Sequence, residues 1–304
     1  MLAAEHLPQS NITHTTMHEA QIQVEMMPTN ENVNSITPIK IPLVSNEPIL
    51  ATSTKYILVN ESTRRKRQFV VYDNQWERFT MRCFIKERVL DALWYDKHNS
   101  FLILTPEKIY ALDPIIKQIN LLTNIIPNDN KPFKSFTLLN QSILLIAYEQ
   151  WSGGCIDYWQ EDNYGQWTLI QQQPLKLTDN EFIGNMITIN ENGCTYLAIT
   201  IHNILTEEWK LELRYVDTLI LHKAILLPET NIASDCRIIP IENAQSNIRL
   251  LAFSTGNPNI IAIDDQLKII GAINYRHPPQ RMALLNENYI IVRTTPRIDI
   301  NTLV

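Results

Sequence analysis

The sequence predicts an all-β fold made of a repeated four-stranded sheet, and its clearest repeat lies between residues 89 and 122. Short runs of Val, Ile, Leu and aromatic residues alternate there with turn residues, as from Asp96 to Asn99. Each run has about the length of a common strand and is too short for a stable helix. The apolar residue types favour strands, and the residues between the runs favour turns. Four antiparallel strands are therefore predicted, at residues 89–95, 100–104, 108–112 and 118–122.

The same pattern returns at intervals of roughly forty to fifty residues, which is the spacing of the blades of a β-propeller. It predicts four more complete blades around the one above, which counts as the second. Their strands lie at residues 49–52, 55–60, 68–72 and 78–85 in the first blade; 133–139, 143–148, 155–159 and 167–172 in the third; 182–190, 195–201, 209–216 and 221–227 in the fourth; and 236–241, 248–253, 259–263 and 268–273 in the fifth.

The end of the chain supplies only three strands, at residues 282–285, 289–293 and 297–302. Residues 36–44 fit the missing fourth strand, because Pro38 and Pro42 point to the same side of a strand and proline is confined to sheet edges. A strand from one terminus that completes the blade begun at the other leaves no open edge where the ring closes. We predict a six-bladed β-propeller of four-stranded antiparallel blades, closed by an N-terminal strand. Five or seven blades, or two stacked β domains without ring closure, are the alternatives.

Several predicted third strands end in an aspartate, at Asp73, Asp113, Asp217 and Asp264. An aspartate in this position can accept hydrogen bonds from the backbone of the following turn, so we expect a structural role. These strand ends, and residues 108–113 in particular, resemble the third strands of propeller repeats in the Trp-Asp, NHL and quinoprotein groups. The sequence lacks the Trp-Asp and Gly-His pairs of the Trp-Asp repeat, so the ligands and partners of that family are not carried over.

Composition restricts the class of protein. The net charge of −6 argues against a nucleic-acid partner, which normally meets a clustered positive surface. No run of about eighteen apolar residues is present, so no membrane span is expected. Four cysteines without a Cys-x-x-Cys pair are expected to be free thiols in a reducing, cytoplasmic compartment. Residues 1–35 are rich in Asn, Thr and Gln and are expected to form a mostly disordered tail, with the propeller at residues 36–304.

The usual signatures of chemistry are missing from the sequence. Its seven glycines form neither a dinucleotide fingerprint nor a phosphate-binding loop, and no Gly-x-Ser-x-Gly or His-Glu-x-x-His motif occurs. His14 and His18 have the spacing of a helical metal pair, but no third ligand lies nearby in the sequence. We therefore expect no catalytic residue, no metal site and no cofactor.

The candidate protein-binding residues lie near predicted connections between second and third strands or between blades, and these connections share one face. Trp, Tyr and Arg often dominate binding energy. A run of four cations in the first blade must lie in solvent, as a plain hairpin tip, a contact for an acidic partner, a nuclear-import signal or a basic cleavage site. The candidates are Arg64, Arg65, Lys66, Arg67, Trp151, His202, Tyr275, Arg276 and His277.

The leading hypothesis for function is a non-catalytic scaffold that presents loop surfaces to protein partners. The alternative is a propeller hydrolase or lactonase with a site in the central channel. Propeller enzymes assemble such sites from residues far apart in the sequence, so missing motifs do not exclude one. The alternative predicts Asp, Glu, Asn or His side chains that converge at one mouth of the ring.

Overall fold

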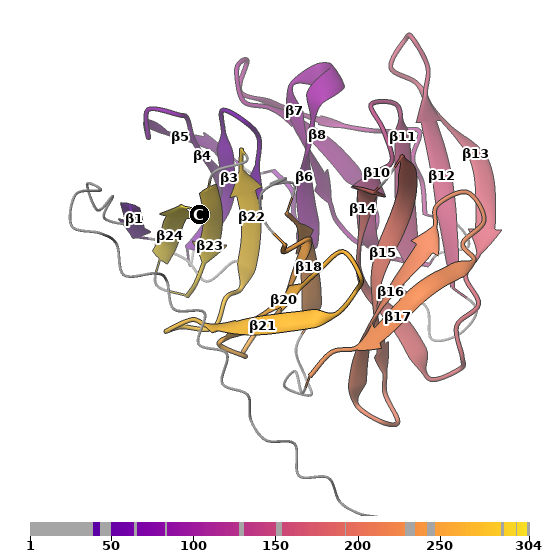
Figure 1. Cartoon of the computed structure of the whole chain (residues 1–304). Helices are drawn as coiled ribbons and strands as arrows, with labels where there is room; N and C mark the ends of the chain where they lie inside the picture. Colours follow the sequence, from indigo (N-terminus) through magenta and orange to yellow (C-terminus); the bar gives the residue numbers. More distant parts are fainter. Residues whose placement is uncertain are drawn as a thin grey trace, which may run out of the picture. The chain divides into compact units, whose positions relative to one another are not determined.

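Six antiparallel sheets of four strands each make up the computed structural model of this chain (Figure 1). The chain divides into two units, Met1–Asn34 and Ser35–Val304, and all described residues belong to the second. The expected disorder of residues 1–35 therefore lies outside the described part and stays a prediction. The structure describes residues 39–42, 50–63, 66–82, 84–127, 131–149, 154–191, 193–228, 235–241, 247–286, 289–295 and 297–302.

The first three blades are consecutive meanders, and each predicted strand is present with its ends shifted by a few residues. Their strands are β2 (Leu50–Thr52), β3 (Ile57–Thr63), β4 (Lys66–Tyr72) and β5 (Arg78–Arg82) in blade 1; β6 (Asp91–Tyr95), β7 (Ser100–Leu104), β8 (Ile109–Asp113) and β9 (Gln118–Leu121) in blade 2; and β10 (Phe133–Leu138), β11 (Ile143–Tyr148), β12 (Cys155–Glu161) and β13 (Trp167–Pro174) in blade 3.

The remaining blades repeat this order until the last one, which takes its outer strand from the beginning of the described chain. Their strands are β14 (Glu181–Glu191), β15 (Cys194–Asn203), β16 (Glu208–Tyr215) and β17 (Leu221–Leu226) in blade 4; β18 (Cys236–Pro240), β19 (Leu250–Ser254), β20 (Asn259–Ile263) and β21 (Ile269–Asn274) in blade 5; and β22 (Arg281–Leu285), β23 (Tyr289–Arg293), β24 (Arg297–Thr302) and β1 (Ile39–Pro42) in blade 6.

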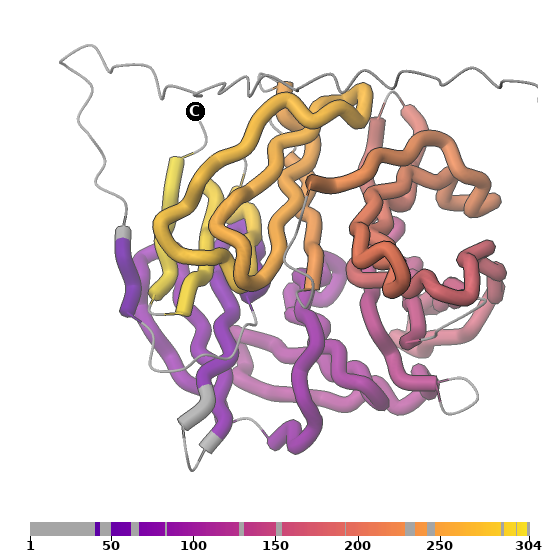
Figure 2. The backbone as a smooth tube through the Cα atoms, turned by 90° about the horizontal axis from the view of Figure 1, so that it is seen from below, coloured from indigo at the N-terminus to yellow at the C-terminus, as the bar shows by residue number. Residues whose placement is uncertain are grey.

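The pairing of β1 with β24 confirms the predicted ring closure. The two strands are antiparallel, with Ile39 opposite Ile300 and Ile41 opposite Ile298. In Figure 2 the sequence colours pass around the ring in order, so that the yellow last blade lies beside the indigo first strands. The sixth sheet thus joins both ends of the described chain, and the six-bladed all-β prediction is correct.

The hydrophobic core is divided into six clusters, and each cluster is shared by two neighbouring blades. One of them joins blade 6 to blade 1, with Ile291 and Ile298 packed near Val59 and Val70. A middle strand touches a neighbour on both faces, which is why all five residues of β7 are buried. An outer strand lacks this cover, and β9 is largely exposed. Closing the ring therefore completes the core, because it forms the cluster between blades 6 and 1.

The turns between third and fourth strands explain how this fold manages with few glycines. The Asp73 carboxylate accepts hydrogen bonds from the backbone N–H groups of Gln75 (2.9 Å) and Glu77 (2.8 Å). Asp113 and Asp264 accept equivalent bonds, which confirms the predicted capping role at three sites. At Asp217 the turn is closed by the backbone instead. In four of these turns a positive φ angle falls on a non-glycine residue, namely Trp76, Lys117, Leu219 and Leu267, whereas in blade 3 it falls on Gly165.

Candidate binding face and central channel

The innermost strand of each blade runs along the ring axis, and these six strands begin at the same end. Asp91, Arg237 and Arg281 stand at or near the starts of β6, β18 and β22 and lie together. At the other end, the Thr52 hydroxyl near the end of β2 donates to the carbonyl of Leu284 near the end of β22. We call the first end the start face. Because strands alternate in direction, the connections between second and third strands and between blades also lie on the start face.

The basic run lies partly in a strand rather than in a loop. Arg64, Arg65 and Trp151 lie outside the described residues. Lys66 begins β4 and pairs with Thr63 of β3. The Arg67 guanidinium donates to the carbonyls of Lys86 (3.1 Å) and Glu87 (3.0 Å), in the connection that leads to blade 2. Arg67 therefore has a structural role in holding this connection.

His202 is buried near the end of β15, contrary to its expected position on a loop surface. Its ring packs against Phe182 and Trp209, with centroids 5.0 Å and 4.7 Å away. Neither ring nitrogen has a hydrogen-bond partner among the described residues. Burial lowers the pKa of His202, and nearby Glu207 offsets only part of this effect. The side chain is thus a core residue in its neutral form.

The segment from Tyr275 to His277 connects blades 5 and 6 on the start face. The Tyr275 hydroxyl donates to Asp299 (3.0 Å) and accepts from Asn301 (3.2 Å), so it ties this connection to β24. Burial, together with the Asp299 carboxylate, raises the pKa of Tyr275 to about 12. Arg276 is exposed and His277 is half-buried. Of these three candidates, Arg276 is the most accessible to a partner.

The central channel holds a cavity of about 820 Å³. It is lined by residues from the innermost strands of all six blades, including Leu50, Phe136 and Met186. Arg237 and Arg281 line its wall near the start face. The walls between the two ends are mostly apolar. The cavity therefore combines an apolar interior with a charged end.

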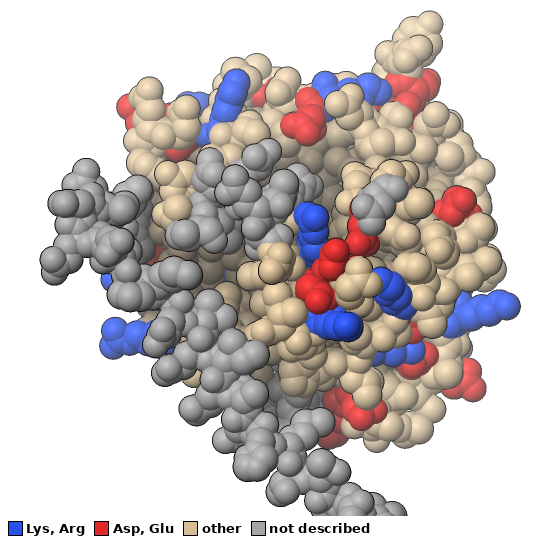
Figure 3. Space-filling model, viewed as in Figure 1, with Lys and Arg blue, Asp and Glu red and all other residues tan. Residues whose placement is uncertain are grey.

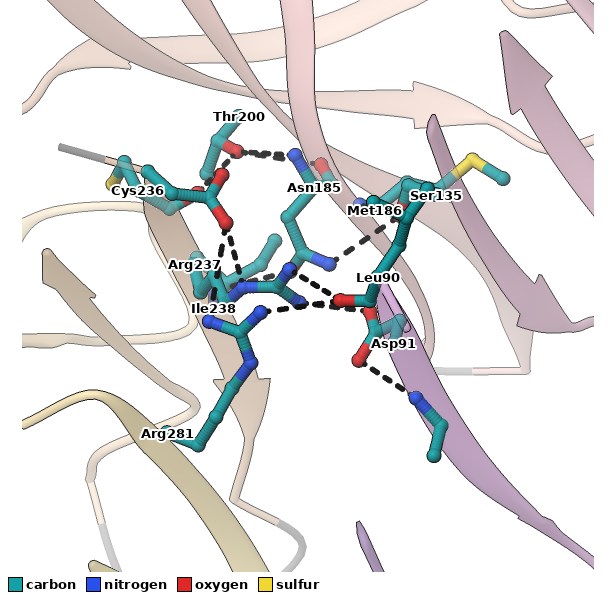
Figure 4. Close-up of polar contacts among 12 residues, drawn as sticks. Leu90, Asp91, Ser135, Asn185, Met186, Thr200, Cys236, Arg237, Ile238 and Arg281 are labelled. Carbon is teal, nitrogen blue, oxygen red and sulfur yellow. Dashed lines mark hydrogen bonds and ion pairs between the residues drawn. The ribbon is translucent and has the colours of Figure 1, made fainter. Parts of the chain in front are cut away.

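Arg237 connects opposite sides of the ring, because blades 2 and 5 face each other across the axis. Its guanidinium donates to the carboxylates of Asp91 in blade 2 (2.8 Å) and Asp235 (2.9 Å), and to the carbonyl of Leu90 (3.2 Å). Figure 4 shows it reaching from β18 to Asp91 on β6. Burial alone would lower the pKa of Arg237, but Asp235 and Asp91 outweigh this and raise it. Sequence reasoning missed this cluster.

Arg281 lies beside Arg237 and is less well compensated. Its guanidinium donates to the carbonyls of Gln280 (3.0 Å) and Leu90 (3.2 Å), so the two arginines share the Leu90 oxygen. Its shortest distance to a carboxylate oxygen is the 3.9 Å to Asp235. Its Nε is buried without a hydrogen-bond partner among the described residues. Burial and the neighbouring Arg237 lower the pKa of Arg281.

A neutral polar network on the other side of the channel holds three blades in register. Asn185 in β14 donates to the Ser135 hydroxyl of blade 3 (3.4 Å) and accepts from the Ile238 N–H of blade 5 (3.2 Å). The Thr200 hydroxyl accepts from the backbone N–H of Asn185 (2.9 Å). These bonds are drawn in Figure 4. They fix the innermost strands of blades 3, 4 and 5 and so set the shape of the channel wall.

The face of the molecule seen in Figure 3 mixes charges of both signs. In Figure 3, Lys and Arg side chains are interspersed with Asp and Glu, without a large area of one sign. On the start face, three connections present exposed apolar side chains, namely Phe84, Ile126 and Leu205. Helical structure within the described ranges is limited to one short turn, η1 (Asp96–His98), so no helix there is long enough to cross a membrane.

This chain is similar to known proteins in structure and not in sequence. No protein family model matches the sequence, and no curated protein matches it. Many solved structures are similar to it. Three of them are the WD40 domain of coronin from Toxoplasma gondii (TM-score 0.60, 8% identity, 87% of this chain and 83% of that chain), a chain of the mitotic checkpoint complex (0.57, 8%, 91% and 94%) and streptogramin B lyase (0.55, 9%, 88% and 98%).

These similarities concern the fold alone, because fewer than one residue in ten is identical. Two of the three structures are a WD40 domain and a chain of a multiprotein complex, and the third is a lyase. The neighbours therefore include both binding modules and an enzyme. Together with the sheet order and the shared cores, they establish that the chain folds as a six-bladed β-propeller.

Proposed function

We propose that this propeller is a non-catalytic module that binds protein partners through its start face. The observation that carries the proposal is that both carboxylates at the channel end are held in ion pairs with Arg237, Asp91 at 2.8 Å and Asp235 at 2.9 Å. Burial alone would raise the pKa of Asp235, but Arg237 and Arg281 outweigh it and hold this pKa below its ordinary value. Asp235 therefore stays ionised at neutral pH, where a general acid or base would need a pKa near 7. Its charge is used for structure and electrostatics.

The start face also offers side chains suited to a protein interface. Phe84 is 79% exposed and Leu205 is 72% exposed, in connections that belong to different blades. Aromatic and arginine side chains often dominate binding energy, and Arg276 is accessible on the same face. We include Arg64, Arg65, Lys66 and Trp151 as further contacts, since the strands that flank these positions end or begin on this face. The structural neighbours include a WD40 domain and a chain of the mitotic checkpoint complex, which supports a protein partner.

A photo-crosslinking experiment tests the proposal with a matched pair of positions in blade 4. Leu205 lies in the β15–β16 connection on the start face, and Ile220 lies in the β16–β17 turn on the opposite face. Both are exposed apolar residues. A photoreactive amino acid is placed at either position in the full chain. The variant with this amino acid at position 205 should capture a partner protein in cells, and the variant with it at position 220 should not capture that protein. Equal capture at both positions, or capture at 220 alone, would contradict the proposal.

An enzyme with its site in the channel is the second candidate. The cavity of about 820 Å³ and the similarity to streptogramin B lyase favour it. Asp91 and Asn185 line this cavity and would be its polar groups. Turnover of a streptogramin B or a lactone by the purified chain, abolished by Asn185→Ala in a folded variant, would support this candidate over the first. Absence of turnover together with start-face capture would favour the binding module.

A further inference from the structure

We propose that Arg281, at the start-face end of the channel, binds a carboxylate group supplied by an acidic side chain of the protein partner. This inference rests on the proposed binding function. It goes beyond that function because it names one anchoring residue, the chemical group that it recognises and the place where that group lies.

The hydrogen-bond capacity of Arg281 is the first argument. A guanidinium carries five N–H donors in a planar fork. Among the described residues, only the carbonyls of Gln280 and Leu90 accept from it at hydrogen-bond distance. The side chain is more than nine-tenths buried, and its Nε has no partner within the described ranges. A buried charged group normally satisfies its donors, so the fork has unused capacity for a ligand.

The nearby carboxylates do not fill this capacity. The Arg237 guanidinium lies 2.8 Å from an Asp91 carboxylate oxygen and 2.9 Å from an Asp235 carboxylate oxygen. The Arg281 guanidinium lies 3.9 Å from the same Asp235 oxygen. Figure 4 shows the two guanidinium groups next to each other, both on the same side of Leu90 and Asp91. The two arginines repel each other, and the oxygen that they share is an uncharged carbonyl. A further anion beside Arg281 would relieve this repulsion.

The surrounding charge favours an anion of low charge. Arg88 and Lys134 add positive potential to that of Arg237 and Arg281. The cluster therefore has four cations and only two carboxylates, those of Asp91 and Asp235. A carboxylate carries one negative charge and two oxygens that match the guanidinium fork. A phosphate dianion would bring a second negative charge close to Asp235. The geometry therefore points to a carboxylate rather than a phosphate.

The cavity beside Arg281 also suits a side chain of a partner. Its walls include Phe253, Met282 and Ile238, which are apolar and buried. The methylene groups of a glutamate can contact these walls while the carboxylate reaches the fork. Apolar surroundings also strengthen the ion pair, because the local dielectric constant is lower than in water.

Thermal unfolding in acetate tests the inference without knowledge of the partner. Acetate replaces chloride at constant ionic strength and pH, and inorganic phosphate is the second probe. A ligand that binds only the folded state raises the unfolding midpoint, by about 2–4 °C at a concentration ten times its Kd. We expect this rise with acetate for the wild-type chain, its loss in Arg281→Gln, and its full retention in Arg249→Gln. Arg249 is an exposed arginine of blade 5 at the opposite face.

A second readout covers the case in which Arg281→Gln folds poorly. Saturation-transfer NMR on acetate reports binding directly, and Arg281→Lys should keep part of the effect because it retains the charge but loses the fork. No effect of acetate beyond chloride, an equal effect in Arg281→Gln, or a rise with phosphate alone would each overturn the assignment. These outcomes are independent of the crosslinking result, so failure of the carboxylate site and failure of the binding function can be told apart.

Discussion

Close packing within blade 4 depends on a glycine in its innermost strand, β14. Gly184 lies where β14 meets β15 with a register shift, and Trp209 of β16 covers it. A Cβ atom at this position would lie 2.4 Å from the Trp209 ring and 2.9 Å from the Thr200 hydroxyl. His202 packs on the same Trp209 ring. One glycine therefore permits a contact on which the neighbouring core depends.

Gly184→Ala should destabilise the protein by about 1–3 kcal/mol, because the rigid indole ring of Trp209 cannot move away without disturbing the core. The free energy of unfolding in urea measures this. Gly154→Ala is the matched control, since its new Cβ would lie 3.3 Å from the flexible end of Leu177 and at an ordinary contact distance of 3.8 Å from Ile183 and Leu175. Equal losses in the two variants would show that Trp209 does not impose the requirement for glycine.

His202 should make stability depend on pH. Its pKa in the folded protein is below the unfolded value of about 6.5, so the unfolded state binds a proton first as the pH falls. The contribution of neutral His202 is complete above about pH 6.5 and declines as the pH falls toward the folded pKa. Urea unfolding at a series of pH values should show this slope. It should diminish in His202→Leu and persist in His222→Gln, which changes an exposed histidine.

Within single elements, hydrogen bonds between residues close in the sequence determine the turns of each blade. An aspartate after the third strand accepts backbone hydrogen bonds at Asp73, Asp113 and Asp264, and a residue with positive φ follows a few positions later. The outer strands are different, because no neighbour covers them and apolar residues such as Leu226 are exposed. Turns were therefore easier to predict than the burial of an outer strand.

Asp73→Ala should lower the free energy of unfolding by about 1 kcal/mol, because the N–H groups of Gln75 and Glu77 lose their charged acceptor. Asp73→Asn keeps an oxygen acceptor and should recover most of the loss. Urea unfolding of the three proteins checks this. If the asparagine variant is as unstable as the alanine variant, the negative charge rather than the hydrogen bonds would be responsible.

Stability at the scale of the whole molecule depends on joining the ends of the ring. β1 covers the edge of β24, and half-buried Ile41 packs against the core shared by blades 6 and 1. The ion pair from Arg237 to Asp91 joins blades that are three apart in the ring. Both contacts link segments that are distant in the sequence, so damage to either should affect the molecule as a whole.

Ile41→Asp should destabilise the protein by about 1–3 kcal/mol and increase amide hydrogen exchange in Arg297–Thr302, because a charged side chain cannot pack in the blade 6–blade 1 core. Lys40→Asp places the same charge on the neighbouring exposed residue and should have little effect. Exchange measured by mass spectrometry distinguishes them. Unchanged protection of β24 in Ile41→Asp would contradict a role for β1 in closure.

The sequence predicted nearly all strands because their signals are local. Apolar runs of strand length and turn residues recur with a regular spacing, and the deficit of one strand at the end matched one strand at the beginning. The positions of the candidate protein-binding side chains were harder to predict than the strands. His202 and Tyr275 are residue types common in interfaces, yet one is buried in the core and the other bonds Asp299. Residue type alone does not show which way a side chain points.

Strand pairing within a blade follows from neighbouring segments and their turns, so the sequence predicted the individual blades. It favoured six blades closed by an N-terminal strand, and the structure decided this number against five or seven. The contacts at the axis depend on tertiary structure. Asp91 and Arg237 are 146 residues apart, and Leu90 and Arg281 are 191 apart. Their meeting depends on how six sheets pack around one axis. No pattern along the chain records that arrangement, because these residues come from three different blades.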